Sequence, residues 1–375
     1  TRWIVFLVIQ ACFSVAFGIS IGGSGKFFLQ AYSTVLILAG LIIFATRTTR
    51  DLIVFVTAYL IGIAALTWQT NFLFKLSSGA GLARLAELYT FDANDVGLIF
   101  VTAFPIAVAL YPVWSGWRRW SIVLLIVAIG VGIARSGSRG AFLALVVSGA
   151  LMLVLSRGVP ASKRIALTAA ILFALVVAAP PGYFKQMNTI VNPTTDYNWT
   201  SPTGRRAVTK RGFGYMMSYP LFGVGISNFN KAECTLSERL VQESRGVGIR
   251  CTAPHSTWVQ VGAELGIPGL IIWFTLLALP IVRLLRLSRR LPIGWLKGDP
   301  EQRFLFACAS SLPISLIGFM VASTFLTFAW LDLPYLLIIF SGSTWLFTMR
   351  RLGAAGGAAQ VERVPQSPRR EWRHP

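Results

Sequence analysis

Residues 304–322 read FLFACASSLPISLIGFMVA, an apolar stretch without a charged side chain. A helix needs about 20 mostly apolar residues to cross the hydrocarbon core of a bilayer. Nine other stretches are comparable, and they lie at about 3–21, 27–45, 52–69, 94–113, 120–134, 141–156, 164–180, 266–282 and 330–348. The sequence therefore predicts an all-α, polytopic membrane protein, a helical bundle of ten spans.

The composition of the whole chain agrees with this prediction. Of its 375 residues, 55% are hydrophobic and only 13% are charged, whereas a soluble domain has about 25% charged residues. These proportions exclude a soluble enzyme, a disulfide-rich secreted module and a disordered chain. A net charge of +20 would suggest a nucleic-acid partner in a soluble protein. Here we expect no nucleic acid, because most basic residues serve to orient the spans.

The positions of the basic residues predict that both termini lie in the cytoplasm. Cytoplasmic loops of membrane proteins carry an excess of Lys and Arg. With both ends inside, most of the 34 Lys and Arg residues fall on the cytoplasmic side, and most of the others fall in one long outer loop, residues 181–254. Long loops are largely exempt from this rule, so the assignment is consistent.

Four segments follow from these spans and loops. Membrane helices are expected at 1–180, a large outer loop with an amphipathic helix at 181–265, and further membrane helices at 266–350. Residues 351–375 form a tail that is first Gly- and Ala-rich and then Pro- and Arg-rich. Such a composition cannot bury a core, so we expect a disordered cytoplasmic tail.

Several familiar catalytic sites are missing from the sequence. There are two histidines, His255 and His374, and the four cysteines form no CxxC motif, so a zinc site is not expected. None of the 14 Asp and Glu residues falls in the middle of a predicted span. Ion-coupled carriers usually keep a carboxylate at that depth, which weakens a transporter reading without excluding it.

Basic side chains on the outer face remain as candidates for chemistry. Arg135 and Arg139 are four residues apart at the junction of two spans, so they share one face of a helix. The long outer loop adds Arg205, Arg206, Lys210, Arg211, Arg245 and Arg250. Arginine matches phosphate oxygens with two parallel hydrogen bonds, so the cluster would suit a lipid-linked phosphate. For any one of these arginines alone, the competing interpretation is an anchor that snorkels to the interface.

His255 is the only histidine before the tail. It precedes an amphipathic stretch that ends in a turn at 266–269, directly before the eighth span. A lone loop histidine is usually a surface residue, but this one begins a helix at the membrane face beside the basic loop. It is therefore a candidate general base near neutral pH.

The cysteines suggest one disulfide. Cys234 and Cys251 both lie in the outer loop, which the orientation places in an oxidising compartment. A bridge closing a loop of this length stabilises by about 3 kcal/mol in the chain-entropy model. Cys12 and Cys308 fall in predicted spans and are expected to pack as apolar side chains.

Four stretches together resemble the O-antigen ligase/polymerase superfamily of bacterial membrane glycosyltransferases. They are FDANDVG at 91–97, SRGA at 138–141, the block from GRR at 204–206 to YPLFGVGISNF at 219–229, and the block from His255-Ser256 to GIPG at 266–269. Ala93 and Ser256 depart from the family, which commonly has Pro and Asn there. The resemblance covers about residues 85–275. Family members often have two more spans, so ten spans fit a chain that lacks an N-terminal hairpin.

The resemblance implies a multi-pass protein of the bacterial inner membrane with its active site facing the periplasm. A glycan on undecaprenyl pyrophosphate would be transferred, with inversion, to a hydroxyl of the lipid A-core, without metal or cofactor. Its implied partners are this lipid-linked glycan, the lipid A-core acceptor and membrane lipid. The residues implied are the base His255, the catalytic cations Arg139 and Arg205, and the pyrophosphate-binding Arg135, Arg206, Lys210 and Arg211.

Two alternatives to an O-antigen ligase, the enzyme of lipopolysaccharide assembly, stay open. An O-antigen or exopolysaccharide polymerase would often have two sizeable basic outer loops, and here loop 70–93 holds only Lys75 and Arg84. An anion carrier would need cations or broken helices at mid-depth, whereas the basic groups lie at one edge. The lipopolysaccharide pattern of a deletion strain would separate ligase from polymerase.

Overall fold

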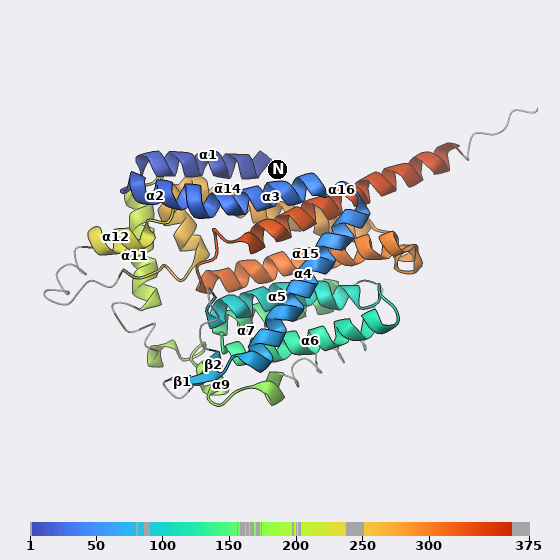
Figure 1. The fold of residues 1–375 in the computed structure, drawn as a ribbon, viewed down its shortest axis with the longest axis horizontal. Coiled ribbons are helices and arrows are strands. Elements are labelled where there is room, and N and C mark those ends of the chain that lie inside the picture. The colour runs from blue at the N-terminus through green and yellow to red at the C-terminus, as the bar shows by residue number, and fades with distance from the viewer. Residues whose placement is uncertain are drawn as a thin grey trace, which may run out of the picture.

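The computed structural model describes residues 2–79, 82–85, 91–155, 175–196, 204–237 and 251–361, with isolated positions at 157, 162, 165, 169, 173, 199 and 201. Residues 164, 166–168, 170–172 and 174 of the predicted span 164–180, as well as Arg245, Arg250 and His374, lie outside the described residues. The described part is a bundle of helices with one small β-hairpin (Figure 1). The prediction of an all-α polytopic membrane protein is confirmed.

The elements follow each other along the chain in the order of their numbers. The helices are α1 (Arg2–Phe17), α2 (Ile21–Phe27), α3 (Ser33–Ala45), α4 (Thr49–Trp68), α5 (Ala93–Leu110), α6 (Trp117–Ser136), α7 (Arg139–Leu155), α9 (Tyr183–Asn188), α11 (Arg205–Ser218), α12 (Phe229–Thr235), α14 (Thr257–Arg290), α15 (Pro300–Ala322) and α16 (Asp332–Val361). Strands β1 (Leu76–Gly79) and β2 (Leu82–Leu85) pair antiparallel, with Ser77 opposite Arg84.

Among the described residues, six helices are long and apolar enough to cross a membrane: Ile21–Ala45, Thr49–Leu73, Ala93–Leu110, Trp117–Ser136, Thr257–Arg290 and Pro300–Phe325. Helices α1 and α7 are apolar but have only 16 and 17 residues. Helix α16 covers the last predicted span and continues to Val361. The first part of the predicted tail is therefore helical, in keeping with the high helix propensity of its alanines.

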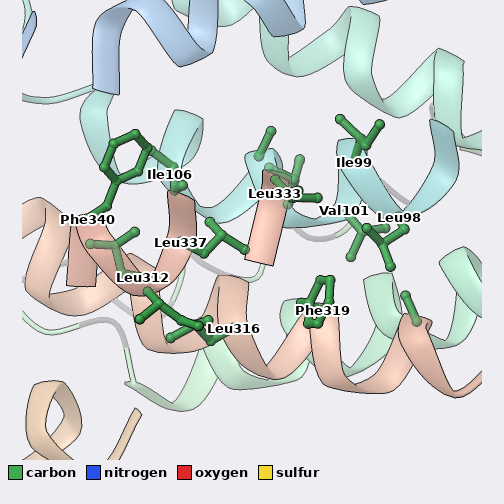
Figure 2. Packing of buried hydrophobic residues seen from close by; sticks show 14 of the residues in the cluster. Leu98, Ile99, Val101, Ile106, Leu312, Leu316, Phe319, Leu333, Leu337 and Phe340 are labelled. Atoms are coloured by element: carbon green, nitrogen blue, oxygen red, sulfur yellow. The ribbon is translucent and has the colours of Figure 1, made fainter. Parts of the chain in front are cut away.

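Helices α5 and α15 form the centre of the bundle, and both are mostly buried. Figure 2 shows their packing with α16, where Leu98 and Val101 of α5 lie near Phe319 of α15. Apolar side chains alone do not drive helices together in lipid, so small residues that allow close approach matter. A Cβ added to Gly97 would lie 2.7 Å from Cβ of Ala141, so glycine at this position lets α5 and α7 touch.

Helix α14 folds back on itself at Gly266, which has a positive φ of 74°. In a straight helix, Trp258 and Phe274 would be about 24 Å apart along the axis, yet their ring centroids are 6.2 Å apart. The arm from Thr257 to Leu265 therefore lies against the arm that begins at Ile267. The turn expected at 266–269 is confirmed, and the kink brings the start of α14 back beside the bundle.

The segment 220–228 is fastened to this kink and to α1. The Gln10 side chain donates to the carbonyls of Leu221 (2.7 Å) and Leu265 (2.8 Å), and the Ser14 hydroxyl donates to that of Glu264 (2.7 Å). The Val224 N–H donates to the Ala263 carbonyl (2.8 Å). Helices α11 and α12, on either side of this segment, are thereby held at one end of the bundle (Figure 1).

The predicted disulfide between Cys234 and Cys251 is confirmed, with 5.2 Å between the two Cα atoms. Cys308 is buried, as expected for a cysteine that packs in the core, but Cys12 is exposed. The expectation of packing is wrong for Cys12 because α1 lies at the edge of the described bundle, where this side chain faces outward.

Candidate active site

Four helices begin close together, around the connection between α15 and α16. The Arg205 side chain, at the start of α11, donates to the Phe325 carbonyl (3.2 Å). The Thr257 hydroxyl, at the start of α14, donates to the Leu326 carbonyl (2.9 Å). A Cβ added to Gly140, in the first turn of α7, would lie 3.0 Å from Cβ of Phe325. The start of α5 touches that of α7, so four N-termini converge.

Helix N-termini are positively polarised and present free N–H groups to anions. At α5 the Asp92 carboxylate occupies this position, accepting from the N–H groups of Asn94 (2.6 Å) and Asp95 (2.9 Å). At α11 the N-cap is Gly204, which has no side chain to bind the free N–H groups. Among the described residues, the start of α11 therefore has no side-chain cap of its own, and Arg205 and Arg206 are its first two residues.

The positive charge of Arg205 lies near both cationic and anionic side chains. It is partly buried, and burial and then the charge of Arg139 hold the pKa of Arg205 below its ordinary value. Arg84 acts in the same direction, whereas Asp92 and Asp196 oppose it. A buried guanidinium beside other cations is stabilised when an anion binds between them, so this place suits phosphate.

Arg139 is the second cation of the site. Its Nη1 donates to the Thr189 hydroxyl (2.6 Å) and forms an ion pair with Asp196. Both side chains of the pair are 17% exposed. The contacts come from the segment that precedes α11, so the loop holds the Arg139 guanidinium in place near Arg205.

His255 lies directly before α14, in a left-handed backbone conformation with φ of 47°. Such a φ is uncommon for residues other than glycine, and strained residues of this kind cluster at functional sites. Burial, and then the charge of Arg205, lower the pKa of His255, while Asp92 acts in the opposite direction. The imidazole is therefore neutral near pH 7 and able to accept a proton.

Four further residues were expected to bind the pyrophosphate beside Arg139, Arg205 and His255, and the structure places them away from this cluster or at its exposed side. Arg135 donates to the carbonyls of Thr70 (3.1 Å) and Phe74 (2.9 Å), beyond the end of α4. Arg211 is bound by Glu233, with Nη2 2.6 Å from Oε2. Arg206 is exposed over the Trp199 ring at 4.8 Å, and Lys210 is exposed. Arg205 and His255 are thus brought together with Arg139, which is itself paired with Asp196. Arg135 and Arg211 are bound by groups outside this cluster.

Two residues of the site were not identified from the sequence. Arg84, on β2, lies close enough to Arg205 to influence its pKa, and the hairpin is docked by the Ala83 N–H, which donates to the Pro181 carbonyl (3.1 Å). Asp92 influences both Arg205 and His255. The positive-inside rule could have indicated Arg84, because basic residues are disfavoured in short outer loops and an arginine found there suggests a specific role.

The fold and this site define a polytopic membrane protein with a cluster of cationic side chains where several helices begin. Residues 124–274 match the family model Wzy_C, described as O-antigen ligase. This match supports the predicted resemblance to the O-antigen ligase superfamily over residues 124–274, and members of that family are glycosyltransferase-like membrane enzymes. It contains Arg139, Arg205 and His255, whereas Arg84 and Asp92 precede it. No curated protein matches the chain.

Proposed function

We propose that this protein is an O-antigen ligase that transfers a glycan from undecaprenyl pyrophosphate to the lipid A-core at the periplasmic face of the inner membrane. The observation that carries this proposal is the meeting of Arg139, Arg205 and His255 at one end of the bundle. These residues come from three separate segments within the family match. They combine the anion-binding and proton-accepting groups that the transfer needs.

In the proposed reaction a hydroxyl oxygen of the acceptor attacks the anomeric carbon of the donor sugar. The bond between this carbon and the pyrophosphate oxygen breaks, and its electron pair leaves with the pyrophosphate. The hydroxyl proton passes to the neutral imidazole of His255. A single displacement of this kind inverts the configuration at the anomeric carbon.

Arg205, Arg139 and the open N-terminus of α11 stabilise the negative charge that develops on the leaving pyrophosphate. Fixed donors aimed at such a charge are usually the largest contribution to catalysis. Arg84 adds a further cation, and Arg206 and Lys210 lie on the exposed side of α11, where they can attract the donor. Since guanidinium groups neutralise the leaving group, we propose a mechanism without metal or cofactor.

The location of the site is part of the proposal. The Cys234–Cys251 disulfide supports a periplasmic position for α11 and α12, because such bonds persist in oxidising compartments. With most of the basic residues of the other loops on the cytoplasmic side, segments 1–180 and 266–350 span the membrane and residues 181–265 form the periplasmic part.

A polymerase that adds repeat units to a second lipid-linked chain is the second candidate. It is favoured by Arg84, because this residue brings the second outer loop into the cationic cluster. The two candidates differ in the lipopolysaccharide made by a deletion strain. Loss of all glycan-capped core, restored by the wild-type gene but not by one encoding Arg205→Ala, is expected for a ligase. A band with a single repeat unit would instead identify a polymerase.

A further inference from the structure

A groove of about 420 Å³ lies between α11 and the folded-back α14. This volume is within the range of about 300–1,000 Å³ that is typical of ligand pockets. Its walls are apolar, and they are formed mainly by Phe213, Met216, Trp258, Val259, Ile271 and Phe274. None of these residues has a role in the proposed chemistry, so the groove calls for a separate explanation.

The fold-back of α14 creates this groove. Trp258 and Val259 belong to the arm before Gly266, whereas Ile271 and Phe274 belong to the arm after it. The third wall is α11, which approaches closely because Gly212 has no side chain: an added Cβ would lie 2.3 Å from Cγ1 of Val259. The groove is therefore a consequence of the same kink that positions His255.

One end of the groove leads to the cationic cluster. A Cβ added to Gly262 would lie 2.7 Å from Sδ of Met216. Gly212 thus meets Val259, and Met216, four residues later, meets Gly262, so α11 and the first arm of α14 run in the same direction. Both helices thus begin at the same end, where Arg205 and His255 lie. Trp258 is three residues from His255, and its indole N–H donates to the Met320 carbonyl (3.3 Å) in the last turns of α15.

The other side of the groove faces outward through apolar side chains. Phe213 on α11 is 51% exposed, and Ile271 and Phe274 are 58% and 52% exposed. The last two residues belong to a helix long and apolar enough to cross a membrane. Exposed side chains of this kind on a membrane helix contact lipid. The groove therefore connects the hydrocarbon of the bilayer with the cations that would hold a pyrophosphate.

We infer that this groove binds the polyprenyl chain of the lipid-linked donor, with its first isoprene units beside Trp258 and the later ones passing Ile271 and Phe274 into the bilayer. The inference rests on the proposed function, since it assigns the lipid part of the same substrate. A polyprenyl pyrophosphate has the required chemistry, an anionic head joined to a flexible apolar chain. The cations at one end of the groove would contact the pyrophosphate, and the apolar walls that follow would contact the polyprenyl chain attached to it.

The test compares donors that carry the same glycan on undecaprenyl pyrophosphate or on a pyrophosphate with only two isoprene units. We expect the wild type to have a KM for the long-chain donor at least about tenfold lower, a difference of about 1.4 kcal/mol. Ile271→Trp, which fills the groove, and Phe213→Ala, which removes part of a wall, should each reduce this ratio towards one. Val282→Trp is the matched control, because Val282 is an exposed residue of the same helix (41%) outside the groove, and its ratio should equal that of the wild type.

An unchanged ratio in both groove variants would overturn the inference, as would an equal change in Val282→Trp. A second measurement does not depend on transfer: a photoreactive undecaprenyl pyrophosphate, with the reactive group in its first isoprene units, is mapped on the purified protein. Labelling at Trp258 or Val259 that unlabelled undecaprenyl pyrophosphate removes supports the groove, even if the wild type transfers neither donor and the proposed ligase activity fails. Labelling at other helices, or labelling that phosphatidylethanolamine removes equally well, overturns it.

Discussion

Arg205 and Arg211 both lie on helix α11, but the charged groups that act most strongly on the two side chains differ in sign. Arg211 pairs with the buried carboxylate of Glu233, whose hydrogen bonds raise the pKa of Arg211. Arg205 lies near Arg139 and Arg84, and its pKa is lowered by burial and by Arg139. A single run of basic residues therefore contains one arginine that is paired with a buried carboxylate and one that lies beside other cations, whose charge we propose serves the ligand.

The largest effect on transfer is expected at the Arg205 end of α11, from His255. His255→Gln removes the base but keeps a polar side chain, so the single-turnover rate at saturating donor should fall about 10²–10⁴-fold. The pKa of His255 is held below its ordinary value of about 6.5. The wild-type rate should therefore be constant above that pH and decrease only in more acidic buffer, where the imidazole becomes protonated. A wild-type rate in the Gln variant would leave His255 as a positioning residue.

The second prediction tests the two arginines directly. Arg205→Ala should lower the rate about 10²–10³-fold, as expected for a lost transition-state donor, with little change in melting temperature. Arg211→Ala should instead destabilise the protein, because breaking a buried ion pair costs about 3–5 kcal/mol and Glu233 is fully buried. Rates and thermal unfolding are measured on the same detergent-purified samples. Equal rate losses at equal melting temperatures would remove the distinction between the two sites.

A smaller effect is expected from Arg84, which contributes charge from the β-hairpin. Arg84→Gln should raise the KM for the donor about five- to tenfold, corresponding to a hydrogen bond or close charge of about 1 kcal/mol. Lys75→Gln is the matched control, since Lys75 is an exposed cation at the start of the same loop. If both variants change KM equally, the loop acts through its overall charge and Arg84 has no specific place in the site.

The smallest effect on transfer is expected on the Arg211 side, from the disulfide. Replacing Cys234 and Cys251 by serine should lower the free energy of unfolding by about 3 kcal/mol. The rate should stay within about twofold of the wild type while the protein is folded, because Cys234 lies on α12 and Cys251 lies four residues before His255, so that neither sulfur belongs to the cluster itself. Cys12→Ser provides the control for a free cysteine. A large rate loss in folded protein would show that the two ends of α11 are coupled.

The membrane class, the positions of most helices and the turn at Gly266 could be predicted from the sequence, because they depend on local hydropathy and on local backbone requirements. The central places of α5 and α15 could not be predicted in this way. Membrane helices are apolar all round, so their periodicity does not show which face or which helix is buried. The close approach at Gly97 depends on Ala141, a residue of another helix.

The candidate site could be predicted in part for a similar reason. Motifs indicated Arg139, Arg205 and His255, and the structure brings these three together. The charge rules could not separate them from Arg135 and Arg211, because these two are held by the carbonyls of Thr70 and Phe74 and by Glu233. Such partners lie far away in the sequence or on another helix, and only tertiary structure reveals them.

The outward-facing side of the α11–α14 groove has a consequence for how rates should be expressed. A donor whose chain enters through Phe213, Ile271 and Phe274 arrives by lateral diffusion within the bilayer. Its relevant concentration is then a mole fraction in lipid, and its supply follows two-dimensional kinetics. Adding inert lipid at constant amounts of enzyme and donor would slow the reaction by surface dilution, whereas adding buffer would leave it unaffected.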